Sequence, residues 1–94
     1  MTMDTIAAQI LQHTRQVLPP GAAAITVTLQ SRLRDELGID SLGLISLMFL
    51  VEEGLSVDMQ PHAASIASCQ TVGEIAEVTL QAVRAGLTDV ETVS

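Results

Sequence analysis

The chain contains no lysine, tryptophan or tyrosine, and Phe49 is the one aromatic residue among its 94 residues. Four arginines stand against eleven acidic residues, which gives a net charge of −7. A nucleic-acid surface needs clustered cations to neutralise phosphates, and an anionic membrane needs them as an anchor. The composition therefore argues against both partners and favours a basic protein surface as the partner.

Cysteine is almost absent as well. Cys69 alone cannot form an internal disulfide, and no Cys or His stands near it at the spacing of zinc ligands. The first four residues do not form the basic start of a signal peptide. The longest apolar run, residues 47–51, is far shorter than the roughly 20 residues that cross a bilayer. These features predict a cytoplasmic protein that binds no metal and no membrane.

What is abundant is apolar side chains, at 48% of the residues with 16% charged. Disordered acidic tails lack such side chains, so this chain is expected to fold. Its length predicts one domain that is too small for a Rossmann or barrel enzyme with its own substrate cleft.

Helical spacing of apolar residues predicts a first helix over residues 4–18, ended by Pro19-Pro20-Gly21. A short helix carrying Ile66 is predicted over 62–68. Thr71 and Glu74 form a capping box, in which the Thr71 hydroxyl accepts from the Glu74 amide and the Glu74 side chain reaches back to the Thr71 amide. The last helix then runs to about residue 85, with Gly86 past its end.

Between the first and second helices, residues 21–40 show no clear period. We interpret them as a long loop held to the core by the apolar residues Ile25, Val27, Leu29, Leu33 and Leu37. A short strand here would lack a partner. The prediction is an all-α four-helix bundle of three main helices and one short helix, with a long first loop. Residues 1–87 would form the domain, and 88–94 a flexible tail.

The second helix is predicted over residues 42–53, with Asp40 and Ser41 as candidate N-caps and Gly54 as its stop. One apolar stripe faces the core and comprises Leu44, Leu47, Met48, Val51 and Leu55. A second stripe of Leu42, Ile45 and Phe49 lies nearly opposite. It is covered either by the first loop or residues 59–64, or by a partner protein; we interpret it as a partner surface.

The segment that opens this helix carries the chemistry. Gly38 allows a tight turn, Leu37 and Ile39 hold the loop to the bundle, and Ser41 emerges where free amides and the helix dipole favour an anion such as a phosphate ester. His13 and His62 are distant in sequence, and no Gly-x-Ser-x-Gly elbow is present. Ser41 is therefore predicted to be an acceptor that another enzyme modifies.

With Glu36-Leu37-Gly38-Ile39-Asp40-Ser41-Leu42 in mid-sequence, the chain resembles the acyl carrier protein family, whose signature D/E-L-G-x-D-S-L opens the second helix of a four-helix bundle. The acidic composition, the long first loop, Glu52-Glu53 and a last helix opening Thr-Val-Gly-Glu extend the resemblance over most of the chain. It implies a carrier that is not itself an enzyme. Ser41 would hold a 4′-phosphopantetheine arm whose thiol carries acyl groups as thioesters.

The resemblance also implies partners. A phosphopantetheinyl transferase would install the arm from coenzyme A with Mg²⁺, and acyl-loading and acyl-processing enzymes would then bind the carrier, which we expect to be a monomer. The residues expected to shape the attachment site are Asp40, Leu42 and Gly38. The residues expected to contact partners are Leu42, Ile45, Phe49, Glu52 and Glu53.

Two positions depart from the family pattern. Many fatty-acid carriers place acids where this chain has Gly43 and Ser46, and partner enzymes recognise that charge. The more apolar helix suits a specialised pathway such as polyketide assembly. A peptidyl or aminoacyl carrier of nonribosomal synthesis is the first alternative, although those more often show Gly-Gly-x-Ser. An unmodified helical adaptor is the second.

Three further side chains are given structural interpretations. His13 is expected to be packed near the core with its hydrogen bonds satisfied. Cys69 is expected to have no catalytic or redox role, since no base or resolving cysteine is evident. Met48 is expected to fill the core, and it would also suit the pliable wall of a site for an acyl chain.

Overall fold

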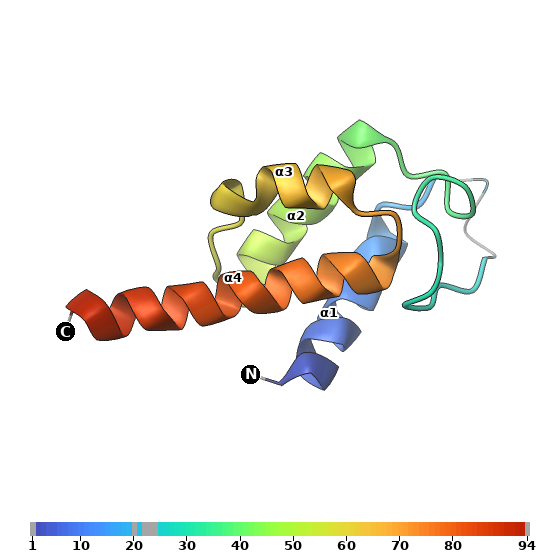
Figure 1. Ribbon diagram of the computed structural model, residues 1–94. Helices are drawn as coiled ribbons and strands as arrows, with labels where there is room; N and C mark the ends of the chain where they lie inside the picture. The colour runs from blue at the N-terminus through green and yellow to red at the C-terminus, as the bar shows by residue number, and fades with distance from the viewer. Residues whose placement is uncertain (1, 20, 22–24, 94) are drawn as a thin grey trace.

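The computed structural model is a helical bundle, described here for residues 2–19, 21 and 25–93, with side chains described as far as residue 85. The helices are α1 (Met3–Gln16), α2 (Ser41–Leu55), α3 (Ala63–Ser68) and α4 (Val72–Val93), and a 3₁₀ turn, η2 (Gln60–His62), precedes α3. In Figure 1, α1 passes behind α4, while α3 and the start of α2 lie above α4. The all-α bundle with one short helix and a long first connection is confirmed.

Helix α1 begins where the sequence can cap it. The Thr2 hydroxyl accepts a hydrogen bond from the Thr5 amide at 3.3 Å, and Asp4 lies in the first turn, where the helix dipole favours an acid. The helix buries Ile6 and Ile10 completely. It ends at Gln16, two residues before the predicted end, with Val17 as its C-cap.

The end of α2 differs from the prediction. Gly54 does not stop the helix, which continues to Leu55 and is followed by Ser56 in the left-handed conformation at φ 52°. Gly54 instead allows close contact with α1, because a Cβ atom there would lie 2.7 Å from Nε2 of His13. His13 is buried, as expected, but no described residue forms a hydrogen bond with either ring nitrogen, so the prediction of a satisfied histidine is wrong.

The connection from α1 to α2 is held to the core. Val27, Leu33 and Leu37 are buried as predicted, whereas Ile25 is 41% exposed and does not pack there. Within the described ranges no strand forms; Arg32 makes an isolated antiparallel bridge with Thr71. Residues 29–33 of the connection thus hold the start of α4 with their backbone groups.

Helix α4 differs from the prediction at both ends. The Glu74 amide donates to the Thr71 hydroxyl at 3.3 Å as the capping box requires, but the Glu74 carboxylate accepts from the Gln70 amide at 2.9 Å and not from that of Thr71. The predicted end near residue 85 is wrong, since α4 continues to Val93. A single glycine, Gly86, costs a helix only about 1 kcal/mol and does not end it.

The extension of α4 carries it past the other helices in Figure 1. The boundary between a carrier domain at 1–87 and a flexible tail at 88–94 stays a prediction, and Ser94 lies outside the described residues.

Helix α1 packs against both α4 and α2, α3 packs against α2 and α4, and the core lies between these helices. Its most deeply buried large side chains come from α1, α2, α4, the first connection and the segment before η2, and they are Ile6, Ile10, Leu33, Leu37, Ile39, Leu47, Val51, Met59, Val72 and Ile75. Burying a side chain of this size stabilises the fold by about 1.5–3 kcal/mol. No helix in the described part of the chain is long and apolar enough to cross a membrane.

Candidate functional site

Ser41 is exposed and occupies the first position of α2. Of the two candidate caps, the structure uses Asp40, whose backbone is extended and whose carboxylate oxygen Oδ1 accepts from the Gly43 amide at 2.9 Å. This leaves the Ser41 hydroxyl free of the capping role, and it makes no hydrogen bond with a described residue. The serine is therefore displayed to solvent at a helix start.

The amides around this serine are also available. The first bond of the helix runs from the Leu44 amide to the Asp40 carbonyl at 2.9 Å, and the Gly43 amide is taken by the cap. No described atom accepts from the amides of Ser41 and Leu42. Free amides at a helix N-terminus are suited to an anion, so the residues present fit a phosphodiester on Ser41.

The loop before α2 is wound tightly to place the serine. Gly38 has φ +69°, a conformation that other residues adopt at a cost, and its amide donates to the Arg34 carbonyl at 3.2 Å. The Ile39 amide donates to the Leu33 carbonyl at 2.8 Å. Leu37 and Ile39 are 1% and 2% exposed, so the predicted roles of the glycine and of this apolar pair are confirmed.

The presence of glycine at position 43 is explained by a contact that the sequence did not reveal. A Cβ atom at this position would lie 2.7 Å from Cγ2 of the buried Ile39, which is closer than carbon atoms pack. A side chain at position 43 would therefore force Ile39 to shift, which makes glycine the favoured residue there. The absence of an acidic residue at position 43 thus follows from the presence of Ile39, two residues before Ser41.

An apolar cavity of about 140 Å³ opens beside Ser41, between α2 and α3. Met48 contributes to its wall, as does Ile66 from α3, and the complete lining is Arg34, Ser41, Leu44, Ile45, Met48, Ala63, Ile66 and Ala67. A second hollow of about 250 Å³ also borders the serine, and Arg34, Gly38, Ile39 and Asp40 complete its lining. Sequence reasoning missed the α3 residues and Arg34, because the packing of α3 against α2 brings the α3 residues to Ser41 and the turn between Leu33 and Ile39 brings Arg34 there.

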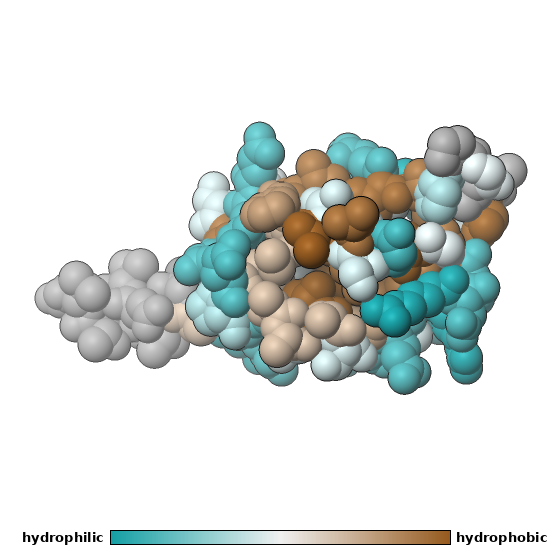
Figure 2. Space-filling model, turned by 90° about the horizontal axis from the view of Figure 1, so that it is seen from above, coloured by the Kyte–Doolittle hydropathy of each residue, from teal (hydrophilic) through white to brown (hydrophobic). Residues whose placement is uncertain are grey.

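The second apolar stripe of α2 is exposed. Leu42 is 74% exposed, Ile45 46% and Phe49 53%, so neither the first loop nor residues 59–64 bury it. Figure 2 shows apolar residues gathered on one face of the molecule and bordered by polar ones. We call Leu42, Ile45 and Phe49 the α2 face.

The two glutamates near the end of α2 have different positions. Glu52 is half-buried, and its carboxylate accepts from the Met59 amide at 3.0 Å, which ties the end of α2 to the segment before α3. Glu53 is exposed. The structure thus gives Glu52 a structural contact, whereas Glu53 is free to meet a partner.

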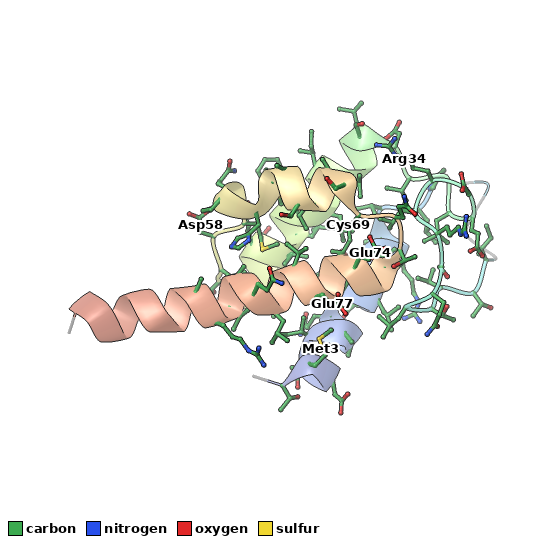
Figure 3. All side chains as sticks on the ribbon, viewed as in Figure 1. Met3, Arg34, Asp58, Cys69, Glu74 and Glu77 are labelled. Atoms are coloured by element: carbon green, nitrogen blue, oxygen red, sulfur yellow. The ribbon has the colours of Figure 1, made fainter. Side chains whose placement is uncertain are left out.

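The chain's own thiol is not part of this site. Cys69 is buried after α3, and its Sγ donates to the Ser65 carbonyl at 3.2 Å. Burial, together with the negative charges of Glu74 and Glu77, raises the pKa of this thiol to about 11. Figure 3 shows both glutamates on the neighbouring part of α4. A protonated thiol is a poor nucleophile, which agrees with the structural interpretation of Cys69.

Comparison with known proteins gives the class of this site. The family model described as "Phosphopantetheine attachment site" matches residues 6–79, a span that includes all of α2 and Ser41. An acyl carrier protein of Saccharopolyspora erythraea is 34% identical over 77 residues, which cover 80% of this chain and 79% of that protein. No solved structure matches.

The chain therefore belongs to the acyl carrier protein family. Members of this family bear 4′-phosphopantetheine covalently on a serine, and they are carriers rather than enzymes. The small domain thus needs no substrate cleft of its own. A flexible tethered thiol and a surface that enzymes recognise are sufficient, because tethering raises the effective concentration of the cargo at each enzyme.

Proposed function

We propose that Ser41 is the residue that bears the 4′-phosphopantetheine arm, and that Asp40, Leu42 and Gly38 shape its surroundings. The observation that carries this proposal is the exposed Ser41 hydroxyl at the start of α2, next to two amides without acceptors. In the transfer, Ser41 Oγ bonds to the phosphorus of coenzyme A that bears pantetheine. The pyrophosphate bond breaks, adenosine 3′,5′-bisphosphate leaves, and the transferase takes the hydroxyl proton.

The surroundings of Ser41 suit an acceptor for a separate enzyme. No described titratable side chain forms a hydrogen bond with its hydroxyl, so the base must come from the transferase. The apolar cavity beside Ser41 offers a place where the arm or an acyl chain can lie. Met48 lines this cavity, in line with the pliable wall expected from the sequence.

We further propose that the α2 face and Glu53 contact partner enzymes, with Glu52 contributing at its edge. An exposed apolar helix face adjoining an attachment site is a typical protein-binding surface. The first turn of α2 contains no acid, so charge recognition there is weak. This composition supports a few dedicated partners in a specialised pathway, such as polyketide assembly, over the general enzymes of fatty-acid synthesis.

We place this carrier in the cytoplasm. Its single cysteine suits a reducing compartment, and the coenzyme A donor and the transferase would have to be present with it.

One experiment tests the attachment site. The purified protein is incubated with coenzyme A, Mg²⁺ and a promiscuous phosphopantetheinyl transferase, and its intact mass is then measured. We expect the wild type to gain one arm and Ser41→Ala to gain none while keeping the same helical circular dichroism. No gain in the wild type, or a gain that persists in Ser41→Ala, would refute the proposal. Loading the product with acyl and aminoacyl donors then distinguishes an acyl carrier from a peptidyl carrier.

A further inference from the structure

We propose that Arg34 is a positioning residue for the arm: its guanidinium forms an ion pair with the phosphodiester that links the arm to Ser41. This inference rests on the attachment proposed above. It adds a residue that lies outside the attachment motif and outside the α2 face.

Arg34 lies in the connection between α1 and α2, and Figure 3 shows it beside the first turn of α2. It lines the apolar cavity of about 140 Å³ and the hollow of about 250 Å³, and Ser41 lines the same two. The side chain is exposed. Arg34 and Ser41 therefore border the same two spaces next to the attachment point.

The acids next to Arg34 in sequence are engaged elsewhere. The Asp35 carboxylate lies 3.6 Å from Nη1 of Arg32, and the Glu36 carboxylate accepts from the Arg32 backbone amide at 3.1 Å. The Arg34 side chain makes no hydrogen bond or ion pair with any residue that the structure describes. A chain with a net charge of −7 thus leaves one cation unpaired beside the serine.

A phosphodiester would complete this arrangement. It carries one negative charge, and the planar guanidinium can donate two parallel hydrogen bonds to its oxygens. The Asp40 carboxylate, which caps the same helix, would repel that charge, and Arg34 would offset the repulsion. Because both groups are exposed, the ion pair is weak and sensitive to salt. Its effect is to orient the base of the arm.

The test compares holo proteins whose arm ends in a free thiol, so that no cargo carboxylate is present. We would prepare the wild type, Arg34→Gln, Arg34→Lys and the control Arg15→Gln, which removes the same charge from the exposed surface of α1 and leaves the Arg32–Asp35 pair intact. ³¹P NMR follows the phosphodiester, and the side-chain Nε–Hε resonance follows Arg34. Holo wild type denatured in urea supplies the ³¹P shift of an arm without contacts.

We expect the Arg34 Nε–Hε resonance to shift between apo and holo wild type, and this shift to shrink at 1 M salt. The ³¹P resonance of Arg34→Gln should move toward the denatured reference, that of Arg34→Lys should lie between, and that of Arg15→Gln should match the wild type. Suppose that the arm is attached, the Nε–Hε resonance is the same in apo and holo protein, and the ³¹P resonance of Arg34→Gln equals that of the wild type. This result would overturn the proposed ion pair and leave the attachment proposal standing. A response of Arg34 only after loading a dicarboxylic acyl group would also overturn the ion pair, since the ligand would then be the cargo. No arm on the wild type would instead refute the attachment proposal.

Discussion

Helices α2 and α4 begin alike in sequence and differently in structure. Each has a capping residue, Asp40 or Thr71, followed by a glycine at or near the third position. At the start of α4 the Val72 amide donates to the Ser31 carbonyl at 3.1 Å, and the Gly73 amide donates to the Leu29 carbonyl at 2.8 Å. The first connection therefore covers this helix start and turns it into a structural joint.

At the start of α2, nothing in the described part of the chain covers the first two amides. Only the Gly43 amide is engaged, by the Asp40 carboxylate, while Ser41 and Leu42 stay exposed. Every α-helix begins with amides that lack a partner within the helix. The same unpaired groups thus serve stability in α4 and, by our proposal, an anion in α2, and the difference lies in whether a loop covers them.

We expect the largest difference in stability between variants that place an aspartate near the start of α4 and on the α2 face. Ile75, in the first turn of α4, is 1% exposed, whereas Ile45, in the second turn of α2, is 46% exposed. Ile75→Asp buries a carboxylate without a partner and should lower the free energy of unfolding by about 4 kcal/mol or more. Ile45→Asp and Phe49→Asp should change it by less than about 1 kcal/mol and slow arm installation or acyl transfer. Urea denaturation and timed intact-mass assays measure these effects.

Loss of helical circular dichroism in Ile45→Asp or Phe49→Asp would show that the α2 face is core, and the contrast would then disappear. Full rates of modification and transfer in both variants would instead show that partners do not use this face.

A variant with a smaller expected effect tests the contact between position 43 and Ile39. Gly43→Ala places a methyl group against Cγ2 of Ile39 and should lower the free energy of unfolding by about 1 kcal/mol, despite the better helix propensity of alanine. Leucine has no methyl at Cγ2, so Ile39→Leu should remove the clash. The double variant should therefore be more stable than the sum of the single changes predicts, as a denaturation cycle measures. Strict additivity would contradict this explanation of Gly43.

The two caps should have equal effects on stability and unequal effects on function. Asp40→Ala and Thr71→Ala each remove one side-chain hydrogen bond to a helix amide, worth about 1 kcal/mol. Only Asp40→Ala should slow arm installation, because only that cap adjoins Ser41. Thermal unfolding and transferase kinetics on both variants check this pair. An equal slowing in Thr71→Ala would mean that the effect reflects global stability.

Cys69, just before α4, is expected to have the smallest effect on stability and function at neutral pH, and its signature is a slow reaction of its thiol. Its pKa rises from 9.0 to about 11, so at pH 8 its thiolate fraction is about a hundredfold lower than that of an unperturbed thiol. Alkylation of the apo protein by iodoacetamide should be slower than that of the unfolded protein by about this factor. A rate equal to that of the unfolded protein would show that the thiol is accessible and ionised.

The same shift predicts the sign of a pH effect on stability. As pH rises from 9 toward 11, the unfolded chain loses the Cys69 proton before the native chain does. The stabilisation by the native thiol is therefore complete below pH 9 and is lost toward pH 11. Cys69→Ala should lack this component of the pH dependence in urea denaturation.

Local patterns predicted the parts of this protein that depend on near neighbours. The period of Ile6 and Ile10, the cap at Thr71 and the turn at Gly38 all involve residues within a few positions, and the structure confirms them. The prediction failed at Gly54 and His13. There the position of α1 against α2 decides what the glycine does and leaves the imidazole without a hydrogen-bond partner among the described residues.

By itself, the sequence determined that this chain folds as an acidic helical domain and that its motif presents Ser41 at a helix start, because composition, period and capping act over short distances. Only the tertiary structure decided which helix start stays open. The first connection reaches the amides of α4 and not those of α2, while α3 and Arg34 come to the sides of Ser41. The contacts of the first connection with α4 and of α3 with the surroundings of Ser41 join residues far apart in the chain, and no local pattern encodes them.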